Sequence, residues 1–242
     1  MNLQDAKVLV VGGSSGMGLA TARRCLEAGA AVTIAGRSAE RLEAARMTLQ
    51  APSALQVVEV DIGDEAQVVS LFARTGSLDH IVSTAADIRG AYQLLPELEL
   101  ADAQRVVQSK FFGPLLLAKH GAPKLAATGS LTFTSGVAAY RPAPRGSVVA
   151  AINAALEGLV RALAVELAPL RVNAVSPGWV DTPIWASVAG DAKDATLQAM
   201  AERLPVGRIG APADIADAIA FLIGNPFTTG TVLHVEGGHR LV

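Results

Sequence analysis

Short apolar runs alternate with amphipathic stretches along the whole chain. The runs are five or six residues long and rich in small aliphatic residues, which is typical of strands buried on both faces, and they lie at 7–11, 31–35, 55–60, 79–83, 130–134, 171–175 and 231–235. The stretches between them have the period of an α-helix, near 15–28, 38–50, 64–75, 99–124, 144–168 and 212–223. Repeated strand–helix–strand units predict an α/β fold with a doubly wound parallel sheet and helices on both faces.

The pattern continues without a linker, a repeat or a low-complexity tract, so we expect one domain over residues 1–242. One irregular stretch, 177–204, begins with Pro177-Gly178. Because insertions at the carboxyl end of a parallel sheet often cover a ligand, this stretch is the candidate substrate lid. Its two tryptophans, Trp179 and Trp185, either pack in the core or, as we favour, wall a substrate pocket.

Composition and charge exclude several classes of protein. The chain is 51% hydrophobic, has a net charge of −2 and contains no basic block, so we expect no nucleic-acid partner. The apolar stretch 147–167 predicts a helix with one wet face rather than a membrane span, because polar residues interrupt it, namely Asn153, Glu157, Arg161 and Glu166. The N-terminus has no signal-peptide pattern, and we expect a cytoplasmic protein. Cys25 is the single cysteine, which predicts a small buried residue, no internal disulfide and no metal site.

A glycine cluster, Gly12-Gly13-Ser14-Ser15-Gly16-Met17-Gly18, joins the first expected strand to the first expected helix. Glycines let the backbone turn sharply and let phosphate oxygens approach without a Cβ in the way. The helix that follows points unpaired N–H groups and the positive end of its dipole at the same place. We therefore interpret the cluster as the pyrophosphate site of a Rossmann-type dinucleotide fold rather than as a purely structural turn, with contacts from Gly12, Ser14, Ser15, Gly16, Met17 and Gly18.

The end of the second strand favours NADP(H) over NAD(H). Gly36-Arg37-Ser38 stands where an NAD-selective site usually has an acidic residue for the ribose 2′-hydroxyl. Arg37, with Ser38 beside it, can pair with a 2′-phosphate, and we expect no nearby carboxylate to repel that phosphate. The alternative is a surface arginine at a helix start, where the helix dipole slightly disfavours a cation.

Taken in order, these motifs resemble the short-chain dehydrogenase/reductase family over nearly the whole chain. The glycine turn is similar to the family's TGxxxGxG, with Val11 in place of Thr, and Ser83-Thr84-Ala85-Ala86 stands where the family has NNAG. Residues 171–178 with Thr182-Pro183 resemble the segment around the nicotinamide, and 206–210, 214–216 and 235–238 resemble the C-terminal third. The resemblance implies further cofactor contacts from Asp61, Ile62, Ala85, Ala86, Pro177, Gly178, Val180 and Thr182.

The same resemblance shows that groups central to the family's chemistry are missing. The family uses a Tyr and a Lys four residues apart on the long helix after the fifth strand, and these positions correspond to Val149 and Asn153. The family's Asn on the preceding long helix corresponds to Lys110. The family's substrate-orienting Ser corresponds to Gly136, with Ser135 directly before it.

Our hypothesis is that an amide and an ammonium have exchanged helices. Lys110 and Asn153 occupy neighbouring positions in the family's fold, so an exchange would keep one positive charge in the pocket; the alternative is a lysine that snorkels to solvent. The missing proton donor could be Tyr140, if the loop 141–145 folds inward, although a surface tyrosine is the favoured interpretation, or Lys110 itself, if burial lowers its pKa. The candidate catalytic residues are therefore Lys110, Ser135, Tyr140 and Asn153.

We expect an NADP(H)-dependent oxidoreductase with an atypical site, acting on a small carbonyl, imine or enone. A positioned general acid raises a rate by ~10²–10⁴-fold. A substrate that depends little on proton transfer tolerates the loss of that acid best. The alternative is an NADP(H)-binding sensor or partner subunit without turnover, which Val149 favours. The resemblance also implies a homodimer or homotetramer, for which the Ala-rich stretch 150–168 suits close helix packing.

Overall fold

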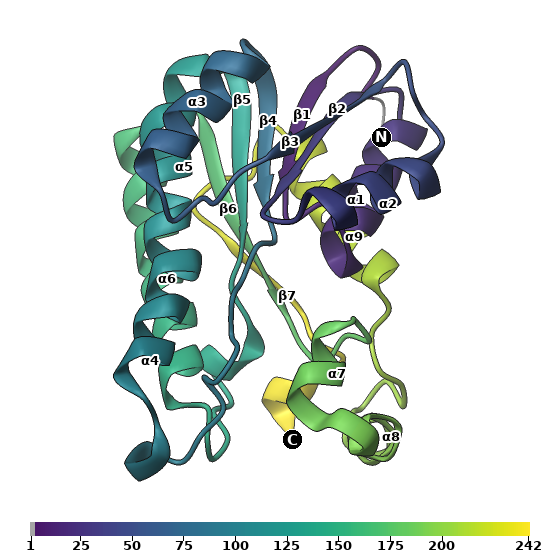
Figure 1. Cartoon of the computed structure of the whole chain (residues 1–242), viewed down its shortest axis with the longest axis vertical. Helices are drawn as coiled ribbons and strands as arrows, with labels where there is room; N and C mark the ends of the chain where they lie inside the picture. Colours follow the sequence, from purple (N-terminus) through teal and green to yellow (C-terminus); the bar gives the residue numbers. More distant parts are fainter. Residues whose placement is uncertain (1–2) are drawn as a thin grey trace.

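The structure, a computed structural model, describes residues 3–242 and is built on a seven-stranded parallel sheet (Figure 1). The strands run in the order β3-β2-β1-β4-β5-β6-β7. Their bounds are β1 Lys7–Val11, β2 Ala31–Gly36, β3 Leu55–Glu59, β4 Leu78–Ser83, β5 Leu125–Thr134, β6 Arg171–Pro177 and β7 Val232–Val235. This order confirms the predicted doubly wound sheet.

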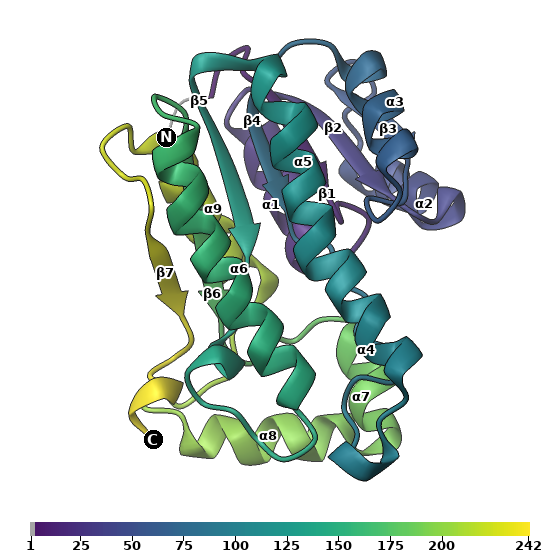
Figure 2. The same cartoon turned by 90° about the vertical axis from the view of Figure 1, so that its left-hand side faces the viewer.

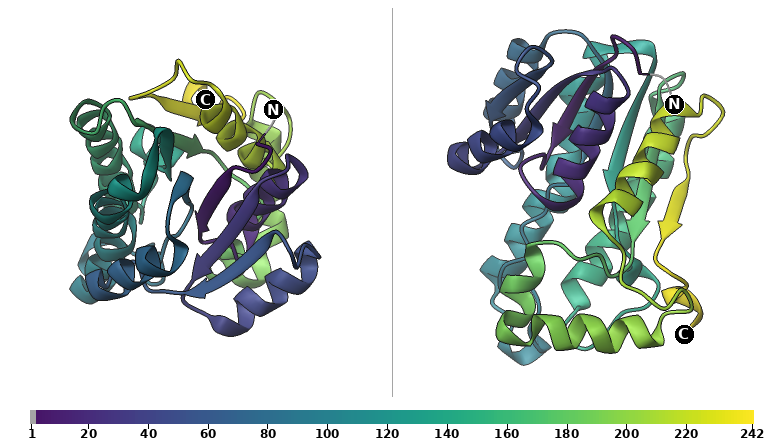
Figure 3. Two further views of the ribbon diagram at one scale, coloured as in Figure 1. Left: turned by 90° about the horizontal axis from the view of Figure 1, so that it is seen from above. Right: turned by 90° about the vertical axis from the view of Figure 1, so that its right-hand side faces the viewer.

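Helices cover both faces of the sheet (Figures 2 and 3). One face is covered by α1 (Gly16–Glu27), α2 (Ala39–Leu49) and α9 (Pro212–Gly224), and the other by α3 (Glu65–Thr75), α5 (Gly113–Gly121) and α6 (Ser147–Glu166). The chain runs outward from β1 to β3, and then outward from β4 to β7 on the other side. The carboxyl ends of β1 and β4 therefore form the switch point at which such sheets bind ligands.

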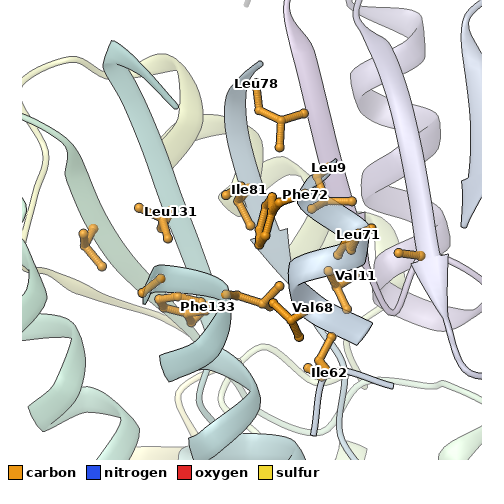
Figure 4. Close-up of a cluster of buried hydrophobic side chains, with 14 of the residues drawn as sticks. Leu9, Val11, Ile62, Val68, Leu71, Phe72, Leu78, Ile81, Leu131 and Phe133 are labelled. Carbon is orange, nitrogen blue, oxygen red and sulfur yellow. The ribbon is translucent and has the colours of Figure 1, made fainter. Parts of the chain in front are cut away.

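Each face of the sheet buries its own apolar cluster, so successive residues of a strand serve different cores. Between the sheet and α3, Phe72 packs with Ile81 and Phe133 (Figure 4). On the opposite face, Cys25 of α1 belongs to the cluster of Val8 and Val10. The predicted burial of Cys25 is confirmed, and that burial raises the pKa of its thiol to about 12.

Besides the longer β5, which begins at Leu125 rather than at residue 130, two expected stretches differ from the structure. The helix expected over 99–124 is divided into α4 (Leu100–Val107), a π-helical turn Gln108–Phe112, and α5. The stretch 177–204, expected to be irregular, contains α7 (Ile184–Ala189) and α8 (Lys193–Arg203). Leu197, Met200 and Ala201 recur at helical spacing on the buried side of α8, which explains why this segment is helical. Both helices lie beyond the carboxyl ends of the strands (Figure 1), and their role as a substrate lid stays a prediction.

By length and composition alone, α6 could cross a membrane. In this structure it packs against the sheet through Leu156 and Val160. The expected wet face is wrong for Asn153 and Glu157, which are both buried. Each finds polar partners inside the protein, which offset the cost of removing it from water.

Candidate active site

The glycine turn is pressed against the end of β4. Gly12 has φ +83°, and a Cβ there would lie 2.7 Å from Thr84 Oγ1. A Cβ on Gly18 would overlap the carbonyl oxygen of Gly12. Ser15, the N-cap residue of α1, makes no side-chain capping bond, so the first N–H groups of the helix are not capped by this side chain. The turn thus offers backbone donors and little side-chain bulk, as a pyrophosphate requires.

The segment after β6 closes against the start of α1. Thr182 Cγ2 lies 3.2 Å from where a Cβ on Gly16 would be. Val180 is buried and forms a parallel bridge with Gly210. A Cβ on Gly178, next to Pro177, would lie 2.7 Å from the Cα of Glu236, which fixes the path of the chain there. The segments that the resemblance assigns to the pyrophosphate and to the nicotinamide therefore meet.

Arg37 has a carboxylate directly beside it, so the expectation that none lies nearby is wrong. Its Nη1 donates to Asp87 Oδ2 at 2.7 Å, and Arg89 donates to the same carboxylate through Nε at 2.8 Å and Nη2 at 2.6 Å. The hydrogen bonds from Arg89, and then those from Arg37, hold the pKa of Asp87 well below its usual range. Asp87 comes 50 residues after Arg37, and only the strand order brings the two together.

Other predicted cofactor contacts have local structural partners. Ser38 caps α2, where its Oγ accepts from the backbone N–H of Arg41 at 3.2 Å. Asp61 Oδ1 accepts from the N–H of Gly63 at 2.9 Å. Ile62 is buried in the core beside Val68 (Figure 4). Their contacts with a cofactor stay predictions.

Lys110 lies in the π-helical turn and is buried rather than snorkelling to solvent. Its Nζ donates to Asn153 Oδ1 at 2.6 Å and to the carbonyl oxygen of Ser135 at 3.2 Å. Burial lowers the pKa of Lys110 to about 8. The π-helical turn changes the direction of the side chains that follow it within an otherwise α-helical stretch. Such turns are frequent at functional sites.

Ser135 and Tyr140 both turn their hydroxyls toward Glu157. Ser135 Oγ donates to Glu157 Oε1 at 2.7 Å, and Tyr140 OH donates to Glu157 Oε2. The Tyr140 ring meets His234 edge to face, with 4.7 Å between centroids. Partial burial and the contact with Glu157 raise the pKa of Tyr140. Tyr140 is 43% exposed, which agrees with the favoured interpretation as a surface tyrosine, and its alternative role as proton donor stays a prediction.

Comparison with known proteins settles the family. The family model described as enoyl-(acyl carrier protein) reductase matches residues 11–240. The short-chain dehydrogenase/reductase malC of Malbranchea aurantiaca is 36% identical over 255 residues, covering 99% of this chain and 96% of that protein. The chain belongs to the short-chain dehydrogenase/reductase family. Its relatives are named dehydrogenases and reductases, and it is an oxidoreductase of that family.

Two solved structures extend the comparison of this short-chain dehydrogenase/reductase. The MalC reductase/Diels-Alderase from Malbranchea aurantiaca is 35% identical with a TM-score of 0.92, covering 99% of this chain and 98% of that one. A small-chain dehydrogenase in complex with NADPH is 34% identical with a TM-score of 0.83, covering 99% of this chain and all of that one. Both similarities span the sheet and the site together.

Of the positions where the resemblance predicts a departure from the family, Gly136 and Asn153 adjoin each other, while Val149 packs elsewhere. Val149 is buried in a small apolar cluster with Ala91 and Val106. A Cβ on Gly136 would lie 2.7 Å from Nδ2 of Asn153. The Asn153 amide therefore fills the space that a serine side chain at position 136 would need.

Sequence reasoning missed Glu157 as a member of the site. It lies four residues after Asn153, so helical spacing alone places both on one face of α6. Its carboxyl group accepts hydrogen bonds from the hydroxyls of Ser135 and Tyr140, and the carbonyl oxygen of the same Ser135 accepts from Lys110. Glu157 is therefore linked to Lys110 through Ser135.

The two tryptophans of the predicted lid stack on each other. Their ring centroids are 4.4 Å apart and the planes differ by 21°. Trp185 Nε1 donates to the carbonyl oxygen of Val180 at 2.8 Å, which anchors the pair to the segment after β6. The stack lies in the predicted lid segment, and its contact with a substrate stays a prediction.

Proposed function

We propose that this chain is an NADP(H)-dependent oxidoreductase that uses Lys110 as its proton donor on a small carbonyl, imine or enone. The observation that carries the proposal is the buried ammonium, held by Asn153 Oδ1 at 2.6 Å and by the carbonyl oxygen of Ser135 at 3.2 Å. A buried ammonium is costly to keep, and both of these partners are neutral. Neutral partners orient the charge without stabilising it as a carboxylate would, so the proton stays transferable.

The cofactor assignment follows from the fit of the glycine turn. Gly12 at positive φ and the tightly packed Gly18 shape a turn without bulky side chains at the start of α1, whose first N–H groups suit a pyrophosphate. Arg37 and the missing carboxylate at Gly36 support NADP(H) over NAD(H), as does the 34% identical neighbour in complex with NADPH. When bound, this cofactor would supply a hydride in the reducing direction, where the chain supplies the proton, and would accept one in the oxidising direction, where the chain takes the proton.

Lys110 is placed to move one proton. An ammonium has three N–H bonds, and two of them point to Asn153 and Ser135, which leaves one for a substrate oxygen or nitrogen. In the reducing direction the proton leaves Nζ for that atom and leaves a neutral amine. Because burial lowers the pKa of Lys110 to about 8, this loss is accessible near neutral pH.

The substrate class follows from the same pocket. Val149 offers no phenol, so the site has a single acid, Lys110, for the developing negative charge. Imines and the polarised double bonds of enones need a weaker acid than simple ketones do, and each has a nitrogen or oxygen that can take the proton of Lys110. They are the substrates that this pocket suits best.

The experiment measures NADPH oxidation over a panel of ketones, imines and enones. Lys110→Met should lower kcat by ~10²–10⁴ on ketones, by less on imines and enones, and leave the Kd for NADPH unchanged. Lys119→Met is the matched control, because Lys119 lies on α5, is 61% exposed and pairs with Glu65. Equal activity of the Lys110 and Lys119 variants would contradict the proposal.

A second candidate function is an NADP(H)-binding sensor or partner subunit without turnover. The observation that favours it is Val149, which fills the family's tyrosine position with an apolar contact to Ala91 and Val106. Under this alternative, the wild type binds NADPH tightly and oxidises it with no member of the panel. Turnover that depends on Lys110 excludes it.

We also propose a two-fold homodimer or homotetramer built on α6. Its outer face carries exposed small residues, Ala154, Ala155 and Ala162, beside the 80% exposed Val165. Small residues let two helices approach closely. Light scattering of the purified protein tests this, and a monomeric mass at micromolar concentration would contradict it.

A further inference from the structure

The ion pair between Arg37 and Asp87 spans the carboxyl end of β1. Arg37 directly follows β2, Asp87 follows β4, and β1 lies between these two strands in the sheet. The 2.7 Å contact between Arg37 Nη1 and Asp87 Oδ2 therefore reaches across the strand that leads into the glycine turn. This is where the proposed function places the adenosine ribose.

Asp87 is the fixed end of this pair and Arg37 the movable end. The Asp87 side chain is 1% exposed, whereas Arg37 is 42% exposed. The Asp87 N–H donates to Ser109 Oγ at 3.0 Å, which ties its backbone to the turn that carries Lys110. Arg89 holds the carboxylate through two N–H donors and is 67% exposed.

The carboxylate has little capacity left for another donor. Oδ2 accepts from Arg37 Nη1 and Arg89 Nη2, and Oδ1 accepts from the Nε and the backbone N–H of Arg89. Two carboxylate oxygens offer about four lone-pair sites, and all four are used. Asp87 is therefore unsuited to bind a ribose 2′-hydroxyl in the way that the acidic residue of an NAD-selective site does.

We propose that Asp87 is a specificity-determining residue that competes with the 2′-phosphate of NADP(H) for Arg37. This inference rests on the proposed function, since it needs that cofactor. When the dinucleotide binds, the Arg37 guanidinium leaves Asp87 for the phosphate, and the bidentate contact with Arg89 keeps the buried carboxylate paired. Breaking the ion pair between Arg37 and Asp87 therefore offsets part of the free energy of binding the phosphate. NAD(H), which has no 2′-phosphate, leaves the pair in place.

The test is calorimetric Kd values for NADPH and NADH on full-length variants. Asp87→Asn should tighten NADPH binding by about five- to tenfold, because it frees Arg37 and removes a repulsive charge, and should leave NADH within about twofold. The gain must vanish in the double variant Arg37→Met with Asp87→Asn. Asp102→Asn is the matched control: it changes the net charge equally and lies in the same ionic cluster, but its partner is Arg105 at 2.8 Å.

A second variant keeps the inference testable if Asp87→Asn fails to fold. Arg89→Met removes an exposed side chain and leaves Asp87 to hold Arg37 alone, so NADPH binding should weaken several-fold while NADH binding does not, with Arg105→Met as control. Unchanged NADPH binding in Asp87→Asn, an equal gain in Asp102→Asn, or a selective loss of NADH binding in Asp87→Asn would each overturn the inference and leave the proposed function intact. A wild type that binds neither dinucleotide would overturn both.

Discussion

The two ends of the proposed cofactor site depart from the family pattern to very different degrees. At the glycine turn, Gly12 and Gly18 are constrained by the backbone itself, because a Cβ on either would meet neighbouring atoms of the turn or of the end of β4. At the reacting end, where the resemblance expects other residues, Asn153 bonds to Lys110 and crowds Gly136, while Val149 packs apart from them with Ala91 and Val106. The backbone of the turn leaves no room for a side chain at these two glycines, whereas the exchange of an ammonium and an amide between helices stays a hypothesis.

The largest effect should come from a substitution in the glycine turn, the end of the proposed cofactor site that keeps the family's residues. Gly18→Ala places a methyl group on the carbonyl oxygen of Gly12, so the turn must shift. Its N–H groups then no longer point at the pyrophosphate. Losing about two hydrogen bonds to a charged phosphate weakens NADPH binding by about 100-fold. Gly158→Ala on α6 is the control, since its Cβ would come no closer than 3.9 Å to Arg161. Calorimetry that shows equal affinity for both variants would remove the turn from the site.

A smaller effect should follow from placing the family's serine at position 136, at the reacting end of the proposed cofactor site. Gly136→Ser puts a side chain 2.7 Å from Asn153 Nδ2, which must move and carry its Oδ1 away from Lys110. We expect unfolding to become easier by about 1–3 kcal/mol, as for other overpacked interiors, and kcat to fall as well. Thermal unfolding and NADPH oxidation measure the two effects.

The matched control for that variant combines Gly136→Ser with Asn153→Ala, which removes the clashing amide. The double variant relieves the clash but leaves the buried Lys110 without its closest partner, so it should regain part of the lost stability and none of the activity. If Gly136→Ser alone leaves the stability and kcat unchanged, the residues at positions 136 and 153 are independent of each other.

The smallest effect concerns the cost of keeping Lys110 buried. Its pKa is lowered from 10.5 to about 8, so between these pH values the unfolded chain binds a proton that the folded chain does not. The free energy of unfolding should therefore rise as the pH rises from 8 to 10.5. Below pH 8 the folded protein should bear the whole destabilisation from the buried Lys110 ammonium. Lys110→Met should remove this dependence and, after the loss of its hydrogen bonds, stabilise the protein at pH 7 by about 1 kcal/mol. Denaturant unfolding at pH 7 and pH 10 measures it, and a strongly destabilised variant would indicate a structural role.

Much of the fold could be predicted because buried parallel strands are continuous apolar runs. All seven expected strands are present, and β1 has the expected bounds. The sequence gives no sign of the first half of β5, since Ala126, Ala127 and Thr128 are exposed and lack an apolar pattern. That part of β5 begins at Leu125, which pairs with Leu78 of β4, a contact that is not local.

The candidate site could be predicted only as far as the family resemblance locates its residues. The resemblance places Asn153 and Lys110 close together, and the structure shows the hydrogen bond between them, while their chemical roles stay predictions. Asp87 was missed because its partner Arg37 is 50 residues away and only the order β2-β1-β4 brings them together. The direction of the Ser135 hydroxyl depends on Glu157, a buried charge that composition makes look like a surface residue.

The most direct test of Lys110 as the proton donor is the pH dependence of single-turnover NADPH oxidation on the best substrate of the panel. Reduction needs the ammonium, so the wild-type rate should be constant at lower pH and fall tenfold per unit above about pH 8, where Lys110 loses its proton. In Lys110→Met this inflection should be absent from the residual rate. The same inflection in both proteins would show that another group donates the proton and would contradict the account.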